Sequence, residues 1–216
     1  PPATDSGNVR IYVAGNAAND DKQNTGDRIF LRNYTLTAQA GISGPPVIRD
    51  TQPVLQAFDN MARLSSGTYV QIFGSNLAGV TRSWGGADFN GPNAPTSLDT
   101  VRVNINGKPA YVSFISPGQV NVQAPDDGSE GPVQVEVVHS GGSSNKVTLN
   151  KTKVSPTLLT TPAFNVGGKQ YVAALHTDLT TFVGRTGLIA GVPFRPARVG
   201  DIIIAYALGC GPTSPA

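Results

Sequence analysis

Glycine and proline divide this sequence into short pieces, because 25 Gly and 17 Pro occur among its 216 residues. Both residue types mark turns and interrupt helices. The pieces between them are rich in Val, Ile, Thr, Tyr and Phe, which are typical of strands. A chain interrupted this often has little room for long helices. We therefore predict an all-β fold of many short strands.

The composition excludes several classes of function. Only 14% of the residues are charged, the net charge is +2, and the basic residues form no run that nucleic acid would need. The single cysteine, Cys210, rules out an internal disulfide and paired-cysteine metal motifs. No apolar run reaches the roughly 18 residues that span a membrane. We expect no cofactor, no nucleic acid partner and no membrane span in this chain.

Residues 1–40 predict a β-hairpin. The segment Val9–Ala14 alternates in polarity, a turn-rich stretch follows, and Arg28–Ala38 gives the second strand. Two strands alone are marginally stable in water, so the hairpin needs something to pack against.

Residues 41–64 resemble a linker that contains one short helix. Proline and glycine dominate its first part. The helix is predicted over 54–65, because apolar residues there recur at helical spacing: Val54, Leu55, Phe58, Met61 and Ala62.

Residues 65–154 predict a β-sandwich. Strand patterns recur at regular intervals, and Asn106-Gly107 between two of them is a strong hairpin signal. The spacing of the turns predicts an immunoglobulin-like sandwich of about seven strands. The remaining residues, 155–216, end in an apolar strand over Ile202–Leu208, which we expect to be buried on both faces.

Several motifs resemble known families. "GTYVQIFGSNL" (Gly67–Leu77), with the later "SPGQVNVQAP" and "GPVQVEVVHSGG", resembles an IPT/TIG-type immunoglobulin-like domain. More narrowly, Ser65–Pro215 resembles an uncharacterised C-terminal domain of secreted acidobacterial proteins, although Cys210 departs from the apolar residue expected there. Gly7–Tyr34 resembles the end of a Reeler-like domain of bacterial surface proteins. These resemblances imply an extracellular or cell-surface location and no catalytic activity.

The same resemblances imply two incomplete β units, one at each end, with 155–216 starting a second IPT-like unit. Unpaired strand edges favour association. Three arrangements would cover the unpaired edges: the two incomplete units complete each other, the last strand joins the middle sandwich, or each unit pairs with a neighbouring subunit. Truncation of the chain would also explain the incomplete units. Strand pairing between subunits predicts self-association into a head-to-tail polymer. The expected interface residues are Val9, Ile11, Val13, Ile202, Ile204 and Tyr206.

Catalytic and metal-binding patterns are weak. His176 and Asp178 have the spacing of a strand-face pair, but no nucleophile motif accompanies them, so a polar strand or turn pair is favoured over a hydrolase. His139 fits an exposed turn residue better than a zinc ligand. A calcium loop is a weak alternative to ordinary turn chemistry for four oxygen-bearing residues: Asp20, Asp21, Asn24 and Asp27.

A few single residues remain. Cys210 is expected to be a small buried hydrophobe, since free cysteines usually are. An intermolecular disulfide partner and a free thiol are the alternatives. Asn33 and Asn150 begin glycosylation triplets, which arise often by chance. Tyr111 and Phe114 are expected in the core rather than on a sugar-binding surface.

The aromatic residues Trp84 and Phe89 lie in a long polar loop and are the candidate contacts for a surface glycan. The sequence thus favours a non-enzymatic extracellular structural protein, with a monomeric adhesion or carbohydrate-binding module as the alternative.

Overall fold

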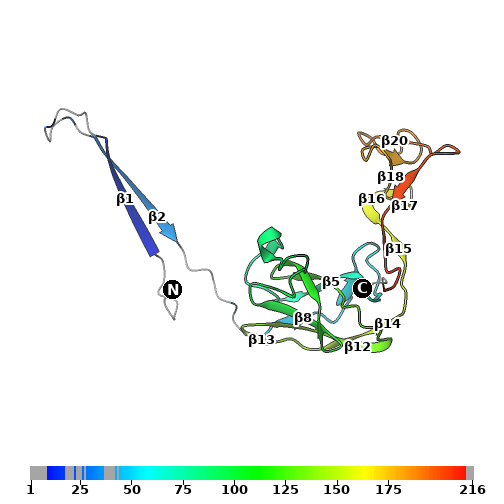
Figure 1. Ribbon diagram of the computed structural model, residues 1–216, viewed down its shortest axis with the longest axis horizontal. Coiled ribbons are helices and arrows are strands. Elements are labelled where there is room, and N and C mark those ends of the chain that lie inside the picture. Colours follow the sequence, from blue (N-terminus) through cyan, green and yellow to red (C-terminus); the bar gives the residue numbers. More distant parts are fainter. Residues whose placement is uncertain are drawn as a thin grey trace. The chain divides into compact units, whose positions relative to one another are not determined.

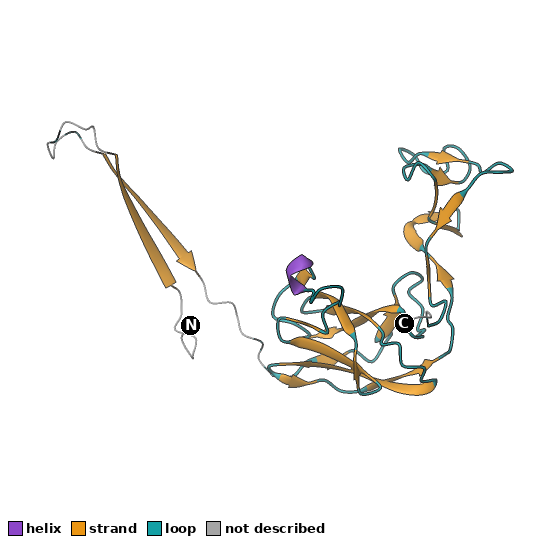
Figure 2. Cartoon of the chain, in the orientation of Figure 1, coloured by secondary structure: helices purple, strands orange, loops and turns teal. Residues whose placement is uncertain are grey.

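The computed structural model describes residues 9–17, 22, 26, 28–36, 42 and 44–212. The chain divides into two compact units, Pro1–Gly41 and Ile42–Ala216. The elements found among these described residues are strands, apart from the short 3-10 turn η1 (Gly86–Asp88), as Figure 2 shows. The all-β prediction is therefore confirmed.

The first unit contains a β-hairpin. Strands β1 (Val9–Ala17) and β2 (Arg28–Leu36) pair antiparallel along their whole length, from Val9 opposite Leu36 to Ala17 opposite Arg28 (Figure 1). They form a two-stranded sheet of their own. Each strand thus has one edge that no strand in this sheet covers.

The second unit begins with a sandwich of two antiparallel sheets (Figure 1). The first sheet contains β3 (Val47–Ile48), β4 (Val54–Gln56), β5 (Tyr69–Ser75), β6 (Arg82–Ser83), β10 (Tyr111–Ile115) and β11 (Gln119–Gln123). The second contains β7 (Ser97–Leu98), β8 (Val101–Ile105), β9 (Lys108–Pro109), β12 (Gly131–His139), β13 (Gly142–Ser143) and β14 (Val147–Lys151).

Alternation along the strands builds the core. In β8, Val101, Val103 and Ile105 are almost fully buried, whereas Arg102 between them is exposed. Because successive side chains of a strand point to opposite faces, this pattern places every second residue between the sheets. The buried apolar residues of both sheets form one continuous cluster. Burial of this apolar surface is the main stabilising contribution to the sandwich.

The turn between β8 and β9 follows the sequence prediction. Asn106 and Gly107 have φ values of 53° and 76°, and Asn104 and Ile105 pair with Pro109 and Lys108. Both central residues of a tight hairpin turn need positive φ, which asparagine and glycine adopt at least cost.

The predicted helix over 54–65 is wrong. Val54–Gln56 form strand β4, which pairs with β5, and all three residues are buried. Residues 57–59 are a turn. The expected linker also contains β3, whose Ile48 lies in the sandwich core. The apolar residues have a local spacing that suits a helix, but pairing with β5 buries them and satisfies their main-chain groups, so the tertiary context decides.

Residues beyond the sandwich form three smaller sheets. These contain β15 (Thr157–Leu158), β16 (Thr160–Val166), β17 (Lys169–Val172), β18 (Ala174–His176), β19 (Phe182–Val183), β20 (Phe194–Arg195), β21 (Ile203–Ala205) and β22 (Ala207–Leu208). A second, smaller apolar cluster holds this region together through Phe164, Ala173, Leu188 and Phe194.

The burial expected for Ile202–Leu208 is wrong within this chain. The segment is divided at Tyr206, because β21 pairs with β18 while β22 pairs with β15. Strand β21 lies at the end of its sheet. Ile202 is 72% exposed and Tyr206 45% exposed. An edge strand covered on one side leaves such residues in water, which explains the difference from a buried central strand.

Candidate functional site

One face of the hairpin carries a group of exposed apolar side chains, Ile11, Val13, Phe30 and Tyr34, called here the hairpin surface. The pairing register puts them on one side, because Ile11 lies opposite Tyr34 and residues two positions apart share a face. Their exposed fractions run from 43% to 60%. The opposite face also exposes Tyr12, Ile29 and Leu31. The hairpin thus exposes large apolar side chains on both faces.

The predicted interface residues are therefore distributed over both units. Val9 belongs to β1, but its side chain lies outside what the structure describes. Ile202 and Tyr206 are exposed, and Ile204 is half-buried within β21. In the part of the chain that the structure describes, both predicted strands keep apolar side chains available for contact.

The four weak calcium candidates, Asp20, Asp21, Asn24 and Asp27, lie outside the described residues. Among the residues that are described, no group of three or more His, Cys, Asp or Glu is placed to hold a metal ion.

The loop around Trp84 is fixed to the sandwich. Trp84 is half-buried against the core, and its main-chain N–H donates to the Ser113 carbonyl at 3.0 Å. Its ring lies 5.2 Å from that of Phe89 at an angle of 57°. Phe89 is 36% exposed. The pair therefore presents one exposed ring that is supported by a partly buried one.

Arg82 holds this loop in place. Its guanidinium bonds both carboxylate oxygens of Asp88, at 2.9 and 3.0 Å, and also reaches Asp99 at 3.1 Å. These bonds raise the pKa of Arg82, and the bond from Arg82, followed by one from the Gly85 N–H, lowers the pKa of Asp88. Hydrogen bonds to the ionised form cause both shifts.

His176 is buried and fully hydrogen-bonded. Arg195 donates to its Nδ1 at 2.8 Å, so Nε2 carries the proton and donates to the Arg195 carbonyl at 3.0 Å. Asp201 bonds Arg195 at 2.8 Å. Asp178 instead accepts from the N–H groups of Thr180 and Thr181. His176 and Asp178 therefore have separate structural partners, in keeping with the favoured polar role.

Three other expectations need correction. His139 is 5% exposed rather than a solvent-exposed turn residue, because its ring bonds the Asn76 carbonyl and the Gly141 N–H. Tyr111 is 37% exposed, since it lies on the outer side of β10; Phe114 is half-buried. Cys210 is exposed, because β22 ends before it. Asn33 and Asn150 are exposed strand residues.

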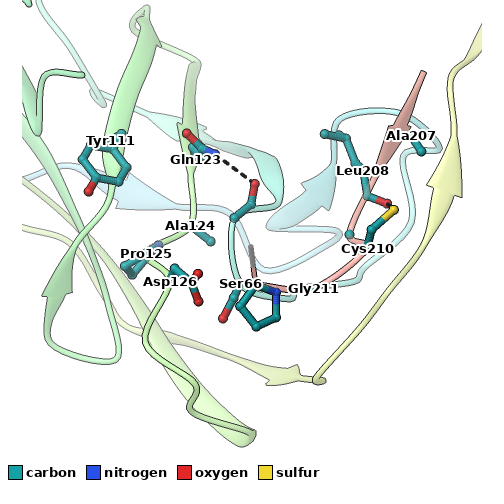
Figure 3. A pocket seen from close by; sticks show the side chains of 13 residues that line it. Ser66, Tyr111, Gln123, Ala124, Pro125, Asp126, Ala207, Leu208, Cys210 and Gly211 are labelled. Carbon is teal, nitrogen blue, oxygen red and sulfur yellow. Dashed lines mark hydrogen bonds between the residues drawn. The ribbon is translucent and has the colours of Figure 1, made fainter. Parts of the chain in front are cut away.

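Tyr111 and Cys210 line one pocket of about 570 Å³, shown in Figure 3. Sandwich residues form one wall and Ala207–Pro212 the other. Gln123 donates to the Gly67 carbonyl at 3.2 Å and so fixes part of the wall. Glycine, alanine and proline make up much of the lining of this pocket, and its polar side chains are those of Ser66, Tyr111, Gln123 and Asp126.

A buried ion pair was missed by the sequence reasoning. Lys151 Nζ contacts Asp127 Oδ1, and the two side chains are 1% and 2% exposed. Burial alone would raise the pKa of Asp127, but hydrogen bonds from Lys151 and Ser129 outweigh it and lower the pKa to about 2. The alternation of β14 gives a signal, because Lys151 shares the inward face with Leu149.

Comparison with known families identifies the sandwich. The two-sheet architecture is that of an immunoglobulin-like fold. The sequence profile of the IPT/TIG domain family matches residues 46–152, the range that β3 to β14 occupy. These residues therefore form an IPT/TIG-type domain, whose fold is non-catalytic. The finer resemblances, to an acidobacterial domain and a Reeler-like domain, stay predictions.

Other comparisons add little about function. No curated protein sequence matches the chain significantly. Among solved structures, gamma-CGTase from alkalophilic Bacillus clarkii is similar at 15% identity and a TM-score of 0.36, over 62% of this chain but 16% of that enzyme's chain. A likeness this distant says nothing about activity. Within the described residues, no helix is long and apolar enough to cross a membrane.

Proposed function

We propose that this chain is a non-enzymatic extracellular structural module that joins a bacterial surface or fibre assembly through β-strand pairing between subunits. The hairpin surface carries the proposal. Apolar groups of this size are costly to keep in water, and a two-stranded sheet buries too little surface to be stable by itself. The hairpin is therefore expected to gain its stability from contact with another surface.

The partner that we propose is a second copy of this chain. Among the residues that the structure describes, strand β21 has one edge with no paired strand, and the exposed Ile202 and Tyr206 flank it. An added strand obtains main-chain hydrogen bonds from such an edge and apolar contacts from its flanking side chains. Hairpin and edge are different surfaces, so their contact is heterologous. Repetition of a heterologous contact that does not close into a ring produces a filament.

The test uses the full chain, purified without refolding. We expect electron microscopy to show filaments and light scattering to show concentration-dependent assembly. Ile11→Asp with Phe30→Asp places two charges on the hairpin surface and is expected to abolish assembly. Asn33→Asp lies on the opposite face of the hairpin and serves as the matched control. Monodisperse wild-type monomers at high concentration, or polymers formed by the double variant, would contradict the proposal.

The second candidate function is glycan binding at Phe89, which the fixed geometry of the Trp84 loop favours. An aromatic ring held in place stacks on a sugar without losing conformational entropy. The informative change is Phe89→Ala, because Trp84 packs on the core and its loss would disturb the fold. The test is a glycan array probed with the wild type and with Phe89→Ala. Binding by the wild type that disappears in the variant would support glycan binding at Phe89, and an array without wild-type binding would reject it.

A further inference from the structure

Lys151 and Asp127 form the most enclosed pair of charged side chains that the structure places in contact. Lys151 is the last residue of β14, and Asp127 precedes β12, whose first residue, Gly131, lies opposite Lys151. Two strand ends are thus connected by a pair that water hardly reaches.

We propose that Lys151 and Asp127 condense, once the chain has folded, to an amide bond between their side chains. This goes beyond the assembly function and does not depend on it. The site is a self-modification site that uses no cofactor. Its reactants are the Lys151 amine and the Asp127 carboxyl group.

Ser129 is positioned to activate the carboxyl group. Its main-chain N–H donates to Asp127 Oδ1 at 3.1 Å, and its hydroxyl donates to the same oxygen at 2.8 Å. Attack on Cγ places negative charge on one carboxyl oxygen. Two fixed donors at Oδ1 stabilise that charge as it develops, in the manner of an oxyanion hole. The Ser129 hydroxyl also lies 3.3 Å from Lys151 Nζ, so it contacts both reactants.

The second carboxyl oxygen, Oδ2, lacks the hydrogen-bond donors that Oδ1 has. It is buried and has no hydrogen-bond partner in the described structure. Lys108 Nζ lies 4.0 Å away, on a side chain that is 58% exposed. Oδ2 is therefore the oxygen that leaves, and the Lys108 ammonium is a second acid beside this carboxyl group, in addition to Lys151 itself.

The step balances without an oxidant or a reductant. It starts from the ion pair, an ammonium and a carboxylate. Lys151 Nζ loses two protons and forms a bond to Asp127 Cγ. The Cγ–Oδ2 bond breaks, and Oδ2 leaves with two protons as water, one of them passing through Lys108. Oδ1 becomes the amide oxygen and keeps both of its Ser129 donors.

Burial favours the product over the reactants. An ion pair taken out of water loses hydration free energy that its mutual attraction only partly restores. The amide carries no charge, and the unpartnered Oδ2 is gone. The bond also fixes the start of β12 to the end of β14, so that a pull on the chain beyond residue 151 cannot separate these strands.

The test is the mass of the denatured wild-type chain after prolonged incubation in the folded state. We expect a mass lower by one water. Trypsin is then expected to release residues 103–146 joined to 147–153, because the modified Lys151 no longer permits cleavage. The joined pair is the decisive species, since Asp127-Gly128 can also lose water by cyclising to a succinimide, which links no second peptide.

Two variants complete the test. Lys151→Arg keeps the positive charge without an acylable amine and is expected to retain its full mass. Ser129→Ala keeps both reactants and is expected to form the joined peptides more slowly. The wild-type measurement needs neither variant to fold. Unjoined peptides from the incubated wild type would overturn the proposal, and so would joined peptides from Lys151→Arg.

Discussion

The side chain of Gln56 donates from Nε2 to the carbonyl oxygen of Ser155 at 3.0 Å, although 99 positions separate the two residues. Gln56 is fully buried in β4. Ser155 in turn donates its N–H to the Gly209 carbonyl at 2.7 Å. These two hydrogen bonds link the sandwich to the residue Ser155, just before β15, and to the segment after β22.

We predict that Gly209→Ala destabilises the chain by at least about 3 kcal/mol. Gly209 has a φ of 71°, and a Cβ there would overlap the Ser155 carbonyl oxygen. Both the strained backbone and the displaced carbonyl contribute. Urea unfolding followed by circular dichroism measures the change.

The matched control is Gly167→Ala. Gly167 has a φ of 59° but open space around a Cβ. The Gly167→Ala substitution is therefore expected to lower the free energy of unfolding only through backbone strain, by about 1 kcal/mol. Equal losses in the two variants would show that the contact with Ser155 is unimportant.

The second prediction concerns the small cluster beyond the sandwich. Phe164 is 7% exposed, and its ring lies 4.9 Å from Phe182 and 5.4 Å from Phe194. Phe164→Ala removes the ring that contacts both others. We expect a loss of about 3–5 kcal/mol in the stability of this region. Amide hydrogen exchange should show faster exchange in β16–β18, with β8 and β12 unchanged. Uniform loss of protection in all these strands would contradict two separate clusters.

The sandwich was predictable because its signals are local. Val101, Val103 and Ile105 alternate with polar neighbours, and Asn106-Gly107 fits only a few turns. Pattern and tertiary structure agree wherever a strand has one buried face. A one-residue shift would expose every core side chain, so the register follows from the same pattern.

In other parts of the fold, strand pairing and burial depend on residues that are distant in the sequence. Val54 and Leu55 are strand residues because β5 lies beside them. Tyr206 is exposed because β21 and β22 pair with different strands. His139 is buried because Asn76, 63 positions away, accepts from its ring. Periodicity carries no information about which strand becomes the neighbour, and these features could not be derived from it.

The third prediction tests the structural role of His176. His176→Ala leaves the Arg195 carbonyl and the Arg195 guanidinium without their ring partner inside the fold. We expect a loss of about 1–3 kcal/mol from the lost hydrogen bonds and packing of the buried ring, since the Arg195 guanidinium is 43% exposed and keeps its bond to Asp201. The measurement is the free energy of unfolding in urea. A variant as stable as wild type would contradict a structural role for His176 and would favour a functional role instead.

The fourth prediction is a pH dependence at Asp178. Main-chain N–H groups of Thr181 and Thr180 lower its pKa from 3.8 to about 2. The ionised carboxylate is thus favoured by folding, so its contribution is complete above pH 3.8 and is lost as the pH falls toward 2. The amide resonances of Thr180 and Thr181 should shift through this range in NMR spectra. Asp178→Asn, which cannot titrate, should leave them unchanged, and a midpoint near 3.8 in wild type would show that the turn has no effect.

The fifth prediction concerns Cys210. Its thiol is exposed, and its contact with the Leu208 carbonyl, at 4.0 Å, is too weak to restrict access to it. We expect native Cys210 to react with a thiol reagent at nearly the rate of the unfolded chain, because rates in folded proteins follow access as well as thiolate content. Ellman's reagent, with and without urea, gives the comparison. A native rate slower by several orders of magnitude would show that another part of the protein covers the thiol. If labelling slows only when subunits assemble, the thiol is covered by a contact between subunits at the segment next to β22.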